Sequence, residues 1–202
     1  MALKTLMFVS HNEGKVREVT AALKPLGVSV VTPEGLGLSA PEETAFTFIE
    51  NALIKARYVA LHTDLPVLAD DSGLQVTALG GAPGVISARY AGEPVDMQRN
   101  IAKLLAELAA LPSDTDRSGM FYSAMVLLRH AQDPCPAVFE GRWLGLIAAS
   151  GSGDAGFGYD PVFYDPVLQK TAAQMTLDEK NKVSHRGQTL AQLADWVGLN
   201  GL

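Results

Sequence analysis

Apolar residues near the start of the chain first form a short run and then recur at helical spacing. Residues 6–9 are the run, and the repeat that follows is Val16, Val19, Leu23 and Leu26. A short apolar run is typical of a strand, and apolar positions three or four residues apart are typical of one face of a helix. With a further apolar run at residues 28–31, the pattern predicts a strand, a turn, a helix and a second strand.

A second helix is predicted at residues 44–61, after a loop rich in glycine and proline at residues 33–41. Its apolar face consists of Ile49, Leu53, Ala56 and Ala60. Thr47 and Glu50 have the spacing of a capping box, in which two side chains satisfy backbone N–H groups at the start of a helix. Lys55 lies on another face of this helix.

Residues 68–84 place two adjacent carboxylates directly after an apolar run. Residues 67–69 are predicted to form a strand that ends in an acidic turn at Asp70 and Asp71. Apolar and polar residues then alternate over residues 74–79, as expected of a bent or paired strand. Acids at the end of a strand lie where neighbouring loops add ligands, so this stretch is the first candidate for chemistry.

The rest of the chain continues the alternation of helices and strands. Asp96 is a candidate N-cap for a third helix, and Leu190, Leu193 and Val197 give the last helix its apolar face. Residues 171–180 are also predicted to be helical. Strands are predicted at residues 120–128, 137–147 and 162–164, the first two as an antiparallel pair.

Composition and charge narrow the class of protein. The chain has 202 residues, 48% hydrophobic and 19% charged, which fits one globular domain or two closely joined lobes and excludes a disordered chain. The net charge of −6 argues against a nucleic-acid binder, because such domains carry a basic stripe. No stretch is long enough to span a membrane, and the single cysteine, Cys135, fits a reducing compartment. We therefore expect a cytoplasmic protein.

Three features suggest a binding site, and each also has a simpler interpretation. Lys15 follows the candidate N-cap Asn12, where a helix start favours an anion, but a solvated lysine explains it equally well. Glu42 and Glu43 precede a helix, where acids are commonly dipole partners. The glycine-rich segment 150–158 ends in aromatic and acidic residues suited to a flat ring, although composition alone favours a simple connector.

Together, the motifs of the chain resemble those of the inosine/xanthosine triphosphate pyrophosphatase family. They include Ser-His-Asn-Glu-Gly-Lys from Ser10, Ala-Asp-Asp-Ser-Gly-Leu from Ala69, Phe-Gly-Tyr-Asp-Pro from Phe157 and Ser-His-Arg-Gly from Ser184. Each motif is weak alone, but they occur in the family's order from Leu6 to about Leu193. The resemblance implies hydrolysis between the α- and β-phosphates of a purine nucleoside triphosphate, releasing a nucleoside monophosphate and pyrophosphate.

The resemblance also implies a fold and an assembly. We expect an α/β fold with a long twisted mixed β-sheet, flanking helices and two lobes around a central substrate cleft. Residues 1–202 would form a single nucleoside triphosphate pyrophosphatase domain. The family is usually homodimeric and depends on Mg²⁺, so the expected partners are the nucleotide, the metal ion and a second copy of the chain.

Carried over motif by motif, the resemblance assigns roles to specific residues. Asp71 would accept the proton of the attacking water and Asp70 would support it, while Lys15 and Lys55 would contact phosphate. The metal ligands would be Glu42, Glu43 and Asp71, and two adjacent glutamates leave open which one binds the ion directly. The triphosphate would also contact Ser10, His11, Asn12, Glu13 and Gly14. Ser72 would touch the substrate, and the base pocket would comprise Phe157, Gly158, Tyr159, Asp160, Lys180, His185 and Arg186.

The residue types suit this chemistry. Lysines and a metal ion neutralise the charge that builds on a leaving pyrophosphate, and Mg²⁺ prefers oxygen ligands. A donor such as Arg186 or His185 would pair with a 6-oxo base and leave a 6-amino base unmatched.

Three other functions fit parts of the same pattern. They are a related pyrophosphatase for modified pyrimidine or methylated nucleotides, a nucleotide-binding regulator without catalysis, and a phosphotransferase with an aspartyl nucleophile. The C-terminal motifs argue against the first, and the intact acids argue against the second. The third would form a covalent intermediate and release orthophosphate.

Overall fold

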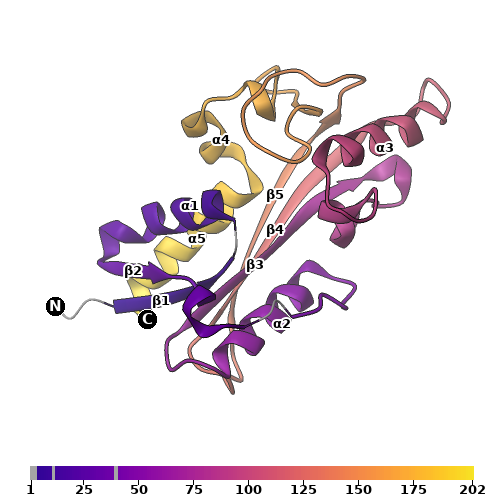
Figure 1. The fold of residues 1–202 in the computed structure, drawn as a ribbon. Coiled ribbons are helices and arrows are strands. Elements are labelled where there is room, and N and C mark those ends of the chain that lie inside the picture. The colour runs from indigo at the N-terminus through magenta and orange to yellow at the C-terminus, as the bar shows by residue number, and fades with distance from the viewer. Residues whose placement is uncertain (1–3, 11, 39–40) are drawn as a thin grey trace. The chain divides into compact units, whose positions relative to one another are not determined.

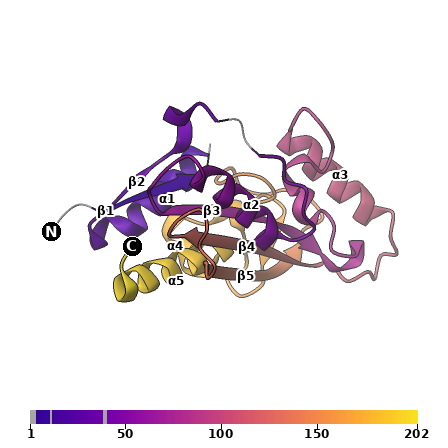
Figure 2. The same ribbon diagram turned by 90° about the horizontal axis from the view of Figure 1, so that it is seen from below.

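The computed structural model describes residues 4–10, 12–38 and 41–202 and contains one seven-stranded sheet. The strand order is β2-β1-β3-β4-β5-β6-β7, and β4 and β5 run side by side (Figures 1 and 2). β1 pairs in parallel with β2 and β3, whereas β6 pairs antiparallel with β5 and β7. The sheet is therefore mixed and open. The strands are β1 Lys4–Val9, β2 Val28–Val31, β3 Val67–Val76, β4 Ser118–Leu128, β5 Ala137–Ile147, β6 Phe163–Asp165 and β7 Lys170–Thr171.

Within the described residues, five α-helices accompany the sheet, so the predicted α/β class with a mixed sheet and flanking helices is confirmed. The helices are α1 Glu13–Leu23, α2 Phe48–Ala60, α3 Met97–Ala109, α4 Leu177–Val183 and α5 His185–Asn200. Asn12, Thr47 and Asp96 accept backbone N–H bonds at the starts of α1, α2 and α3, as the sequence predicts. No helix in the described ranges is both long and apolar enough to cross a membrane.

The chain divides into two compact units. Unit 1 comprises Met1–Asp71, Ser123–Glu140 and Gln188–Leu202, and unit 2 comprises Ser72–Tyr122 and Gly141–Gly187. Each unit has its own hydrophobic core.

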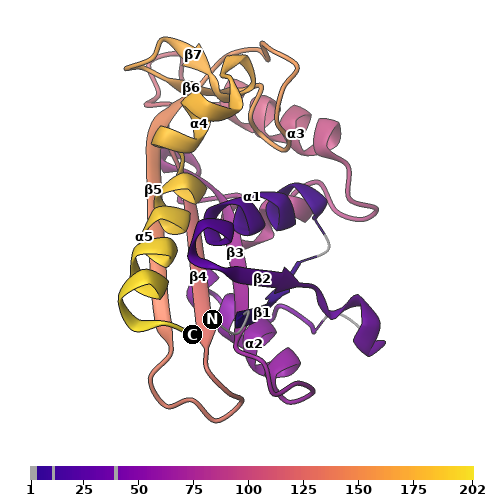
Figure 3. The same ribbon diagram turned by 90° about the vertical axis from the view of Figure 1, so that its left-hand side faces the viewer.

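The core of unit 1 has two layers because strand side chains alternate between the faces of a sheet. Leu6 and Leu68 pack with α1 and α5 on one face, and α1 and α5 lie side by side there (Figures 1 and 3). Met7, Val67 and Ala69 pack with α2 in a separate cluster. The apolar runs predicted as strands are thus covered by helices on both faces.

The core of unit 2 is built around aromatic residues. The rings of Phe121, Trp143 and Phe163 contact one another, with centroids 4.5 Å apart for Phe121 and Phe163 and 4.8 Å apart for Trp143 and Phe163. The indole N–H of Trp143 donates to the buried carboxylate of Asp165 at 2.8 Å, which satisfies both polar groups. Lys170 of β7 pairs with Glu179 of α4 at 2.7 Å, and these elements lie close together in Figure 3.

The prediction of an acidic turn after residue 69 was wrong. β3 continues from Val67 through the two aspartates to Val76 without interruption. β3 lies between β1, whose pairing reaches Ala69, and β4, and these neighbouring strands override the low strand propensity of Asp-Asp-Ser-Gly.

Two helix predictions also had incorrect limits. α2 begins at Phe48 rather than at residue 44, because Asn51 exchanges two hydrogen bonds with the backbone of Ala45 and holds that segment outside the helix. Residues 171–180 form a short 3₁₀ turn and the start of α4 instead of one helix. The break is at Met175, whose backbone is extended, after which Thr176 caps α4.

Candidate active site

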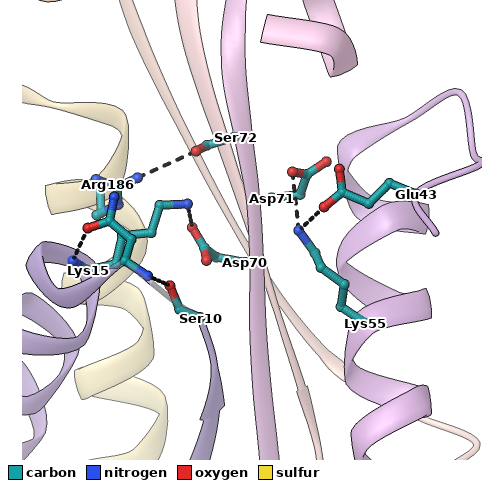
Figure 4. Close-up of polar contacts among 9 residues, drawn as sticks. Ser10, Lys15, Glu43, Lys55, Asp70, Asp71, Ser72 and Arg186 are labelled. Atoms are coloured by element: carbon teal, nitrogen blue, oxygen red, sulfur yellow. Dashed lines mark hydrogen bonds and ion pairs between the residues drawn. The ribbon is translucent and has the colours of Figure 1, made fainter. Parts of the chain in front are cut away.

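The two adjacent aspartates of β3 point to opposite faces of the strand. Asp70 continues the face of Leu68, which packs with α1, and Asp71 continues the face of Ala69, which packs with α2. Figure 4 shows Asp70 directed toward Lys15 and Asp71 directed toward Lys55. The strand therefore separates the two acids into two different charge pairs.

The first pair joins β3 to the beginning of α1. The ammonium of Lys15 lies 2.7 Å from Oδ2 of Asp70, whose side chain is buried. The side chain of Asn12 accepts the backbone N–H of Lys15, and the hydroxyl of Ser10 accepts the backbone N–H of Asn12. These contacts arrange the β1–α1 turn around the helix start, where N–H groups and the helix dipole favour an anion.

The second pair is a triad on the α2 side. The ammonium of Lys55 lies 2.7 Å from Oε1 of Glu43 and 3.3 Å from Oδ1 of Asp71. Burial by itself would lower the pKa of Lys55, but the nearby carboxylates of Asp71, Asp70 and Glu43 raise it above its ordinary value. Lys55 is therefore positively charged at neutral pH.

The pKa of Asp71 differs from that of an ordinary surface carboxylate. Burial raises its pKa from 3.8 to about 6, against the opposing effect of Lys55, and the charges of Glu43 and Asp70 add to the increase. Its Oδ2 atom is buried and accepts no hydrogen bond from the described residues. A carboxylate with one unsatisfied oxygen and a pKa near neutrality is suited to accept a proton from water.

Two of the three predicted metal ligands fit a metal ion. The Lys55 ammonium already places one positive charge between Glu43 and Asp71, and Oδ2 of Asp71 still lacks a partner among the described residues. Glu42 is exposed. Over residues 4–10, 12–38 and 41–202, no three His, Cys, Asp or Glu side chains are grouped to share an ion. Two carboxylates completed by phosphate oxygens and waters suit Mg²⁺, which keeps several waters in protein sites.

A pocket of about 200 Å³ in unit 1 is lined by members of both charge groups. Its charged lining consists of Lys15, Asp70, Glu43, Lys55 and Glu34. The rest of its lining is largely apolar and includes Pro33, Leu38, Pro41, Tyr58 and Val59.

Several of these lining residues carry no role in the sequence-based prediction. Tyr58 follows Lys55 by three residues on α2, so helical spacing offered a signal for it. The segment from Pro33 to Pro41 was predicted only as a loop, and no pattern in it indicated a pocket wall.

The predicted base-binding residues of unit 2 gather around the ring of Phe157, which is 44% exposed. The ammonium of Lys180 lies 5.3 Å from the ring centroid, and the guanidinium carbon of Arg186 lies 5.4 Å from it. The buried carboxylate of Asp160 accepts the backbone N–H of Phe157 at 2.8 Å and also pairs with Lys180. This group offers one flat face and two cationic donors.

Two other predicted base-pocket residues, Tyr159 and His185, are packed in the interior of unit 2. The ring of Tyr159 belongs to the core, and its hydroxyl donates to the backbone carbonyl of Ser87 at 2.9 Å. Burial raises the pKa of Tyr159 well above its ordinary value, so its hydroxyl stays protonated. His185 is buried and stacks on Phe121, with ring centroids 4.8 Å apart. No pattern in the sequence indicated this bond to Ser87.

The structure also gives the positions of three other predicted contact residues, Ser72, Glu13 and Gly14. Arg186 donates to the hydroxyl of Ser72 at 3.4 Å. Glu13 is exposed and lies 4.0 Å from Arg17, and Gly14 lies in the first turn of α1. His11 lies outside the described residues.

Replacing Gly156 with alanine should distort the turn that carries Phe157. A Cβ atom there would lie 2.0 Å from Oδ2 of Asp160, at a backbone φ of +79° that other residues rarely adopt. We expect the KM for the nucleotide that the resemblance implies to rise about tenfold or more, because the mutation displaces the carboxylate that holds Phe157 and Lys180.

Gly158→Ala is the matched control for Gly156→Ala. Gly158 has a similar φ of +63°, but nothing lies within 4 Å of an added Cβ. Steady-state kinetics on both variants should show a smaller change for Gly158→Ala. Equal changes would mean that backbone strain, and not the contact with Asp160, is responsible.

Comparisons with known proteins identify the family. Residues 6–196 match the model of the Ham1 family, and the chain belongs to that family. A dITP/XTP pyrophosphatase of Yersinia pseudotuberculosis is 51% identical over 193 residues, which cover 96% of this chain and 98% of the relative. One of Nitrosomonas europaea is 49% identical over 198 residues, covering 98% and 96%.

Solved structures agree with this assignment. A HAM1 protein from Coxiella burnetii superposes with a TM-score of 0.92 at 43% identity, covering 96% of this chain and 98% of that protein. The Staphylococcus aureus Ham1 protein gives a TM-score of 0.86 at 38% identity, with the same coverage. The resemblance inferred from the motifs is thus confirmed.

Proposed function

We propose that this protein hydrolyses dITP, ITP, XTP and dXTP to the nucleoside monophosphate and pyrophosphate. The observation that carries the proposal is the Asp71–Lys55–Glu43 triad, with its partly unsatisfied buried carboxylate, in a chain 51% identical to a dITP/XTP pyrophosphatase. Such an activity removes deaminated purines from the nucleotide pool before polymerases use them.

In this proposal the residues of unit 1 act on the phosphates. The N–H groups at the start of α1 and the Lys15 ammonium bind phosphate oxygens, and Lys55 adds a second positive charge. Asp71 orients a water molecule and takes its proton as the water attacks phosphorus. The bond to the leaving pyrophosphate breaks, and the lysines offset the charge that develops on it.

Glu43 and Asp71 would hold Mg²⁺, with Glu42 as the alternative to Glu43. When bound, the ion supplies positive charge to the phosphates and lowers the charge repulsion among the carboxylates.

In unit 2, the exposed ring of Phe157 offers a stacking surface for a purine. Arg186 and Lys180 carry only N–H donors, which match the 6-oxo acceptor of hypoxanthine and xanthine and leave the 6-amino group of adenine unmatched. A buried unmatched polar group costs roughly 1–3 kcal/mol, so one such contact gives about tenfold to hundredfold selectivity.

One assay tests the proposed reaction. Purified protein with Mg²⁺ is incubated with ITP, XTP, dITP, GTP, ATP and dUTP, and both products are identified. We expect monophosphate and pyrophosphate from ITP, XTP and dITP. Release of orthophosphate with a diphosphate, or a covalent aspartyl phosphate, would instead support the phosphotransferase alternative. Preferential turnover of dUTP would support a pyrimidine pyrophosphatase.

Replacing Lys55 with methionine should tighten metal binding while weakening pyrophosphate binding. The ammonium lies between the two carboxylates that we assign to the metal, so a bound ion must compete with it. Removing it should lower the Kd for Mn²⁺ about tenfold, which corresponds to about 1.4 kcal/mol. Isothermal titration of the metal-free protein measures this directly. Lys103→Met, which removes a lysine paired with Glu107 in unit 2, is the control. Unchanged or weaker Mn²⁺ binding in Lys55→Met would exclude this metal position.

A cytoplasmic location, a homodimer and the absence of a nucleic-acid partner complete the proposal. The single cysteine supports the cytoplasmic location, and the net charge of −6 supports the absence of a nucleic-acid partner. The family resemblance supports the dimer. Light scattering coupled to size-exclusion chromatography measures the oligomeric state.

A further inference from the structure

Asp70 has a more specific place in the site than the sequence suggested. The sequence-based interpretation has it support Asp71, but the two side chains leave β3 on opposite faces (Figure 4). Oδ2 of Asp70 instead lies 2.7 Å from the Lys15 ammonium, and the Asp70 side chain is only 3% exposed. A carboxylate this buried is stable in its charged form only when a cation or hydrogen-bond donors compensate it.

Lys15 in turn occupies a position that is unfavourable for a cation. It lies in the first turn of α1, whose N-terminus carries a partial positive charge. Its side chain is 18% exposed, so solvent alone does not compensate it. With no anion at hand, a flexible lysine in this position gains by turning its ammonium away from the helix start into water. The carboxylate of Asp70 opposes that movement.

A lysine held in this way is suited to bind phosphate. An ammonium carries three N–H donors, so it can bridge a carboxylate and a phosphate oxygen at the same time. Asp70 lies inside the ten-residue strand β3 and directly follows Ala69, which pairs with Val9 of β1, so its carboxylate is anchored to the sheet. Fixing the ammonium beside the N–H groups of α1 reduces the ordering that phosphate binding would otherwise require.

We propose that Asp70 is a positioning residue that holds Lys15 for the phosphates, and that it is neither a metal ligand nor the catalytic base. This inference rests on the proposed function, because it assigns a role within the same phosphate site. Asp71 and Asp70 then serve different parts of the reaction although they are neighbours in sequence: one acts on water, and the other acts through Lys15 on the leaving group.

A double-mutant cycle tests the inference. The affinity for inorganic pyrophosphate is measured by calorimetry in metal-free buffer for wild type, Asp70→Asn, Lys15→Met and the double variant. We expect Asp70→Asn to weaken binding about tenfold, or about 1.4 kcal/mol. In the Lys15→Met background the same change should have no further cost, because the ammonium that Asp70 positions is absent there. Tighter binding in Asp70→Asn would show that its charge simply repels phosphate, and additive losses would show that it acts independently. Either result overturns the inference.

Three further measurements complete the test. Asp70→Asn should bind Mn²⁺ as wild type does, whereas Asp71→Asn should not; a parallel loss would make Asp70 a metal ligand. Asp70→Glu retains a carboxylate and should keep more pyrophosphate affinity than Asp70→Asn, and the reverse order would contradict the proposal. Asp96→Asn makes the same chemical change at the N-cap of α3, where Asn caps equally well, and should leave pyrophosphate affinity unchanged.

The cycle is independent of turnover. Failure of the wild type to hydrolyse ITP would count against the proposed function alone, because the coupling between Asp70 and Lys15 is measured with pyrophosphate and without a reaction.

Discussion

Asp71→Asn should reduce the turnover of ITP about 1,000-fold or more, because it removes the proposed proton acceptor and a proposed metal ligand together. The same variant should be at least as stable as the wild type. Burial raises the pKa of Asp71 to about 6 in the folded protein, against an ordinary 3.8, so folding disfavours the charged carboxylate. Asparagine is neutral at every pH and avoids this cost, while Lys55 keeps its contact with Glu43.

The pH dependence of stability provides a second test of the Asp71 assignment. Because the folded protein binds the Asp71 proton more tightly than the unfolded chain, this group should lower the free energy of unfolding as pH rises from about 4 to about 6. The loss is at most about 3 kcal/mol for a shift of this size. Urea unfolding of the metal-free wild type and of Asp71→Asn across this range should show the decrease only in the wild type. Activity should rise over the same range as the base loses its proton.

Asp133→Asn is the control for Asp71→Asn, because the pKa of Asp133 is lowered in the folded protein whereas that of Asp71 is raised. Asp133 is buried, and its hydrogen bonds with Arg129 hold its pKa far below the ordinary range. Loss of the Asp133 carboxylate should therefore cost roughly 1–3 kcal/mol of stability and leave the activity of the folded protein intact.

If Asp71→Asn turns over ITP at a near-normal rate, Asp71 is not the base.

Arg186→Ala should abolish the preference for ITP over ATP, lowering the ratio of their kcat/KM values about tenfold to hundredfold. Arg186 is buried, lies over the face of Phe157 and contributes donors suited to a 6-oxo group. Its removal takes away the donor that ATP cannot match, so ITP should lose more than ATP does. Competition between the two nucleotides in one assay gives the ratio directly.

The control for Arg186→Ala is a second arginine that lies over an aromatic ring in unit 2. The guanidinium carbon of Arg142 lies 5.2 Å from the ring centroid of Tyr122, and Arg142 is an exposed residue of strand β5. Arg142→Ala should leave the ITP-to-ATP ratio unchanged. A ratio that survives in Arg186→Ala would assign the selection to Lys180 or His185 instead.

Local patterns predicted much of the fold. The spacing of Val19 and Leu23 placed α1 correctly, and Asn12, Thr47 and Asp96 marked helix starts because their side chains act on backbone groups within three residues. What local patterns missed depends on partners distant in the sequence. The course of β3 through Asp70 and Asp71 is imposed by neighbouring strands, so propensity alone suggested a turn.

In the candidate site too, local motifs identified residues, whereas contacts between distant residues could not be predicted. The motifs identified Lys15, Lys55 and Asp71, but not which acid each lysine meets, because those contacts join residues up to 55 positions apart. The bond from Tyr159 to the carbonyl of Ser87 spans 72 positions and involves a backbone atom, which carries no residue-specific signal.

The register of β3 decides which chemistry each aspartate performs. Side chains along a strand alternate with a period of two, so a one-residue slip would exchange the partners of Asp70 and Asp71. That slip would also move Leu68 out of the core formed with α1 and Ala69 out of the core formed with α2. The apolar residues before the acids therefore do more than stabilise the sheet. By making the slipped register costly, they keep the proton acceptor and the lysine anchor from changing places.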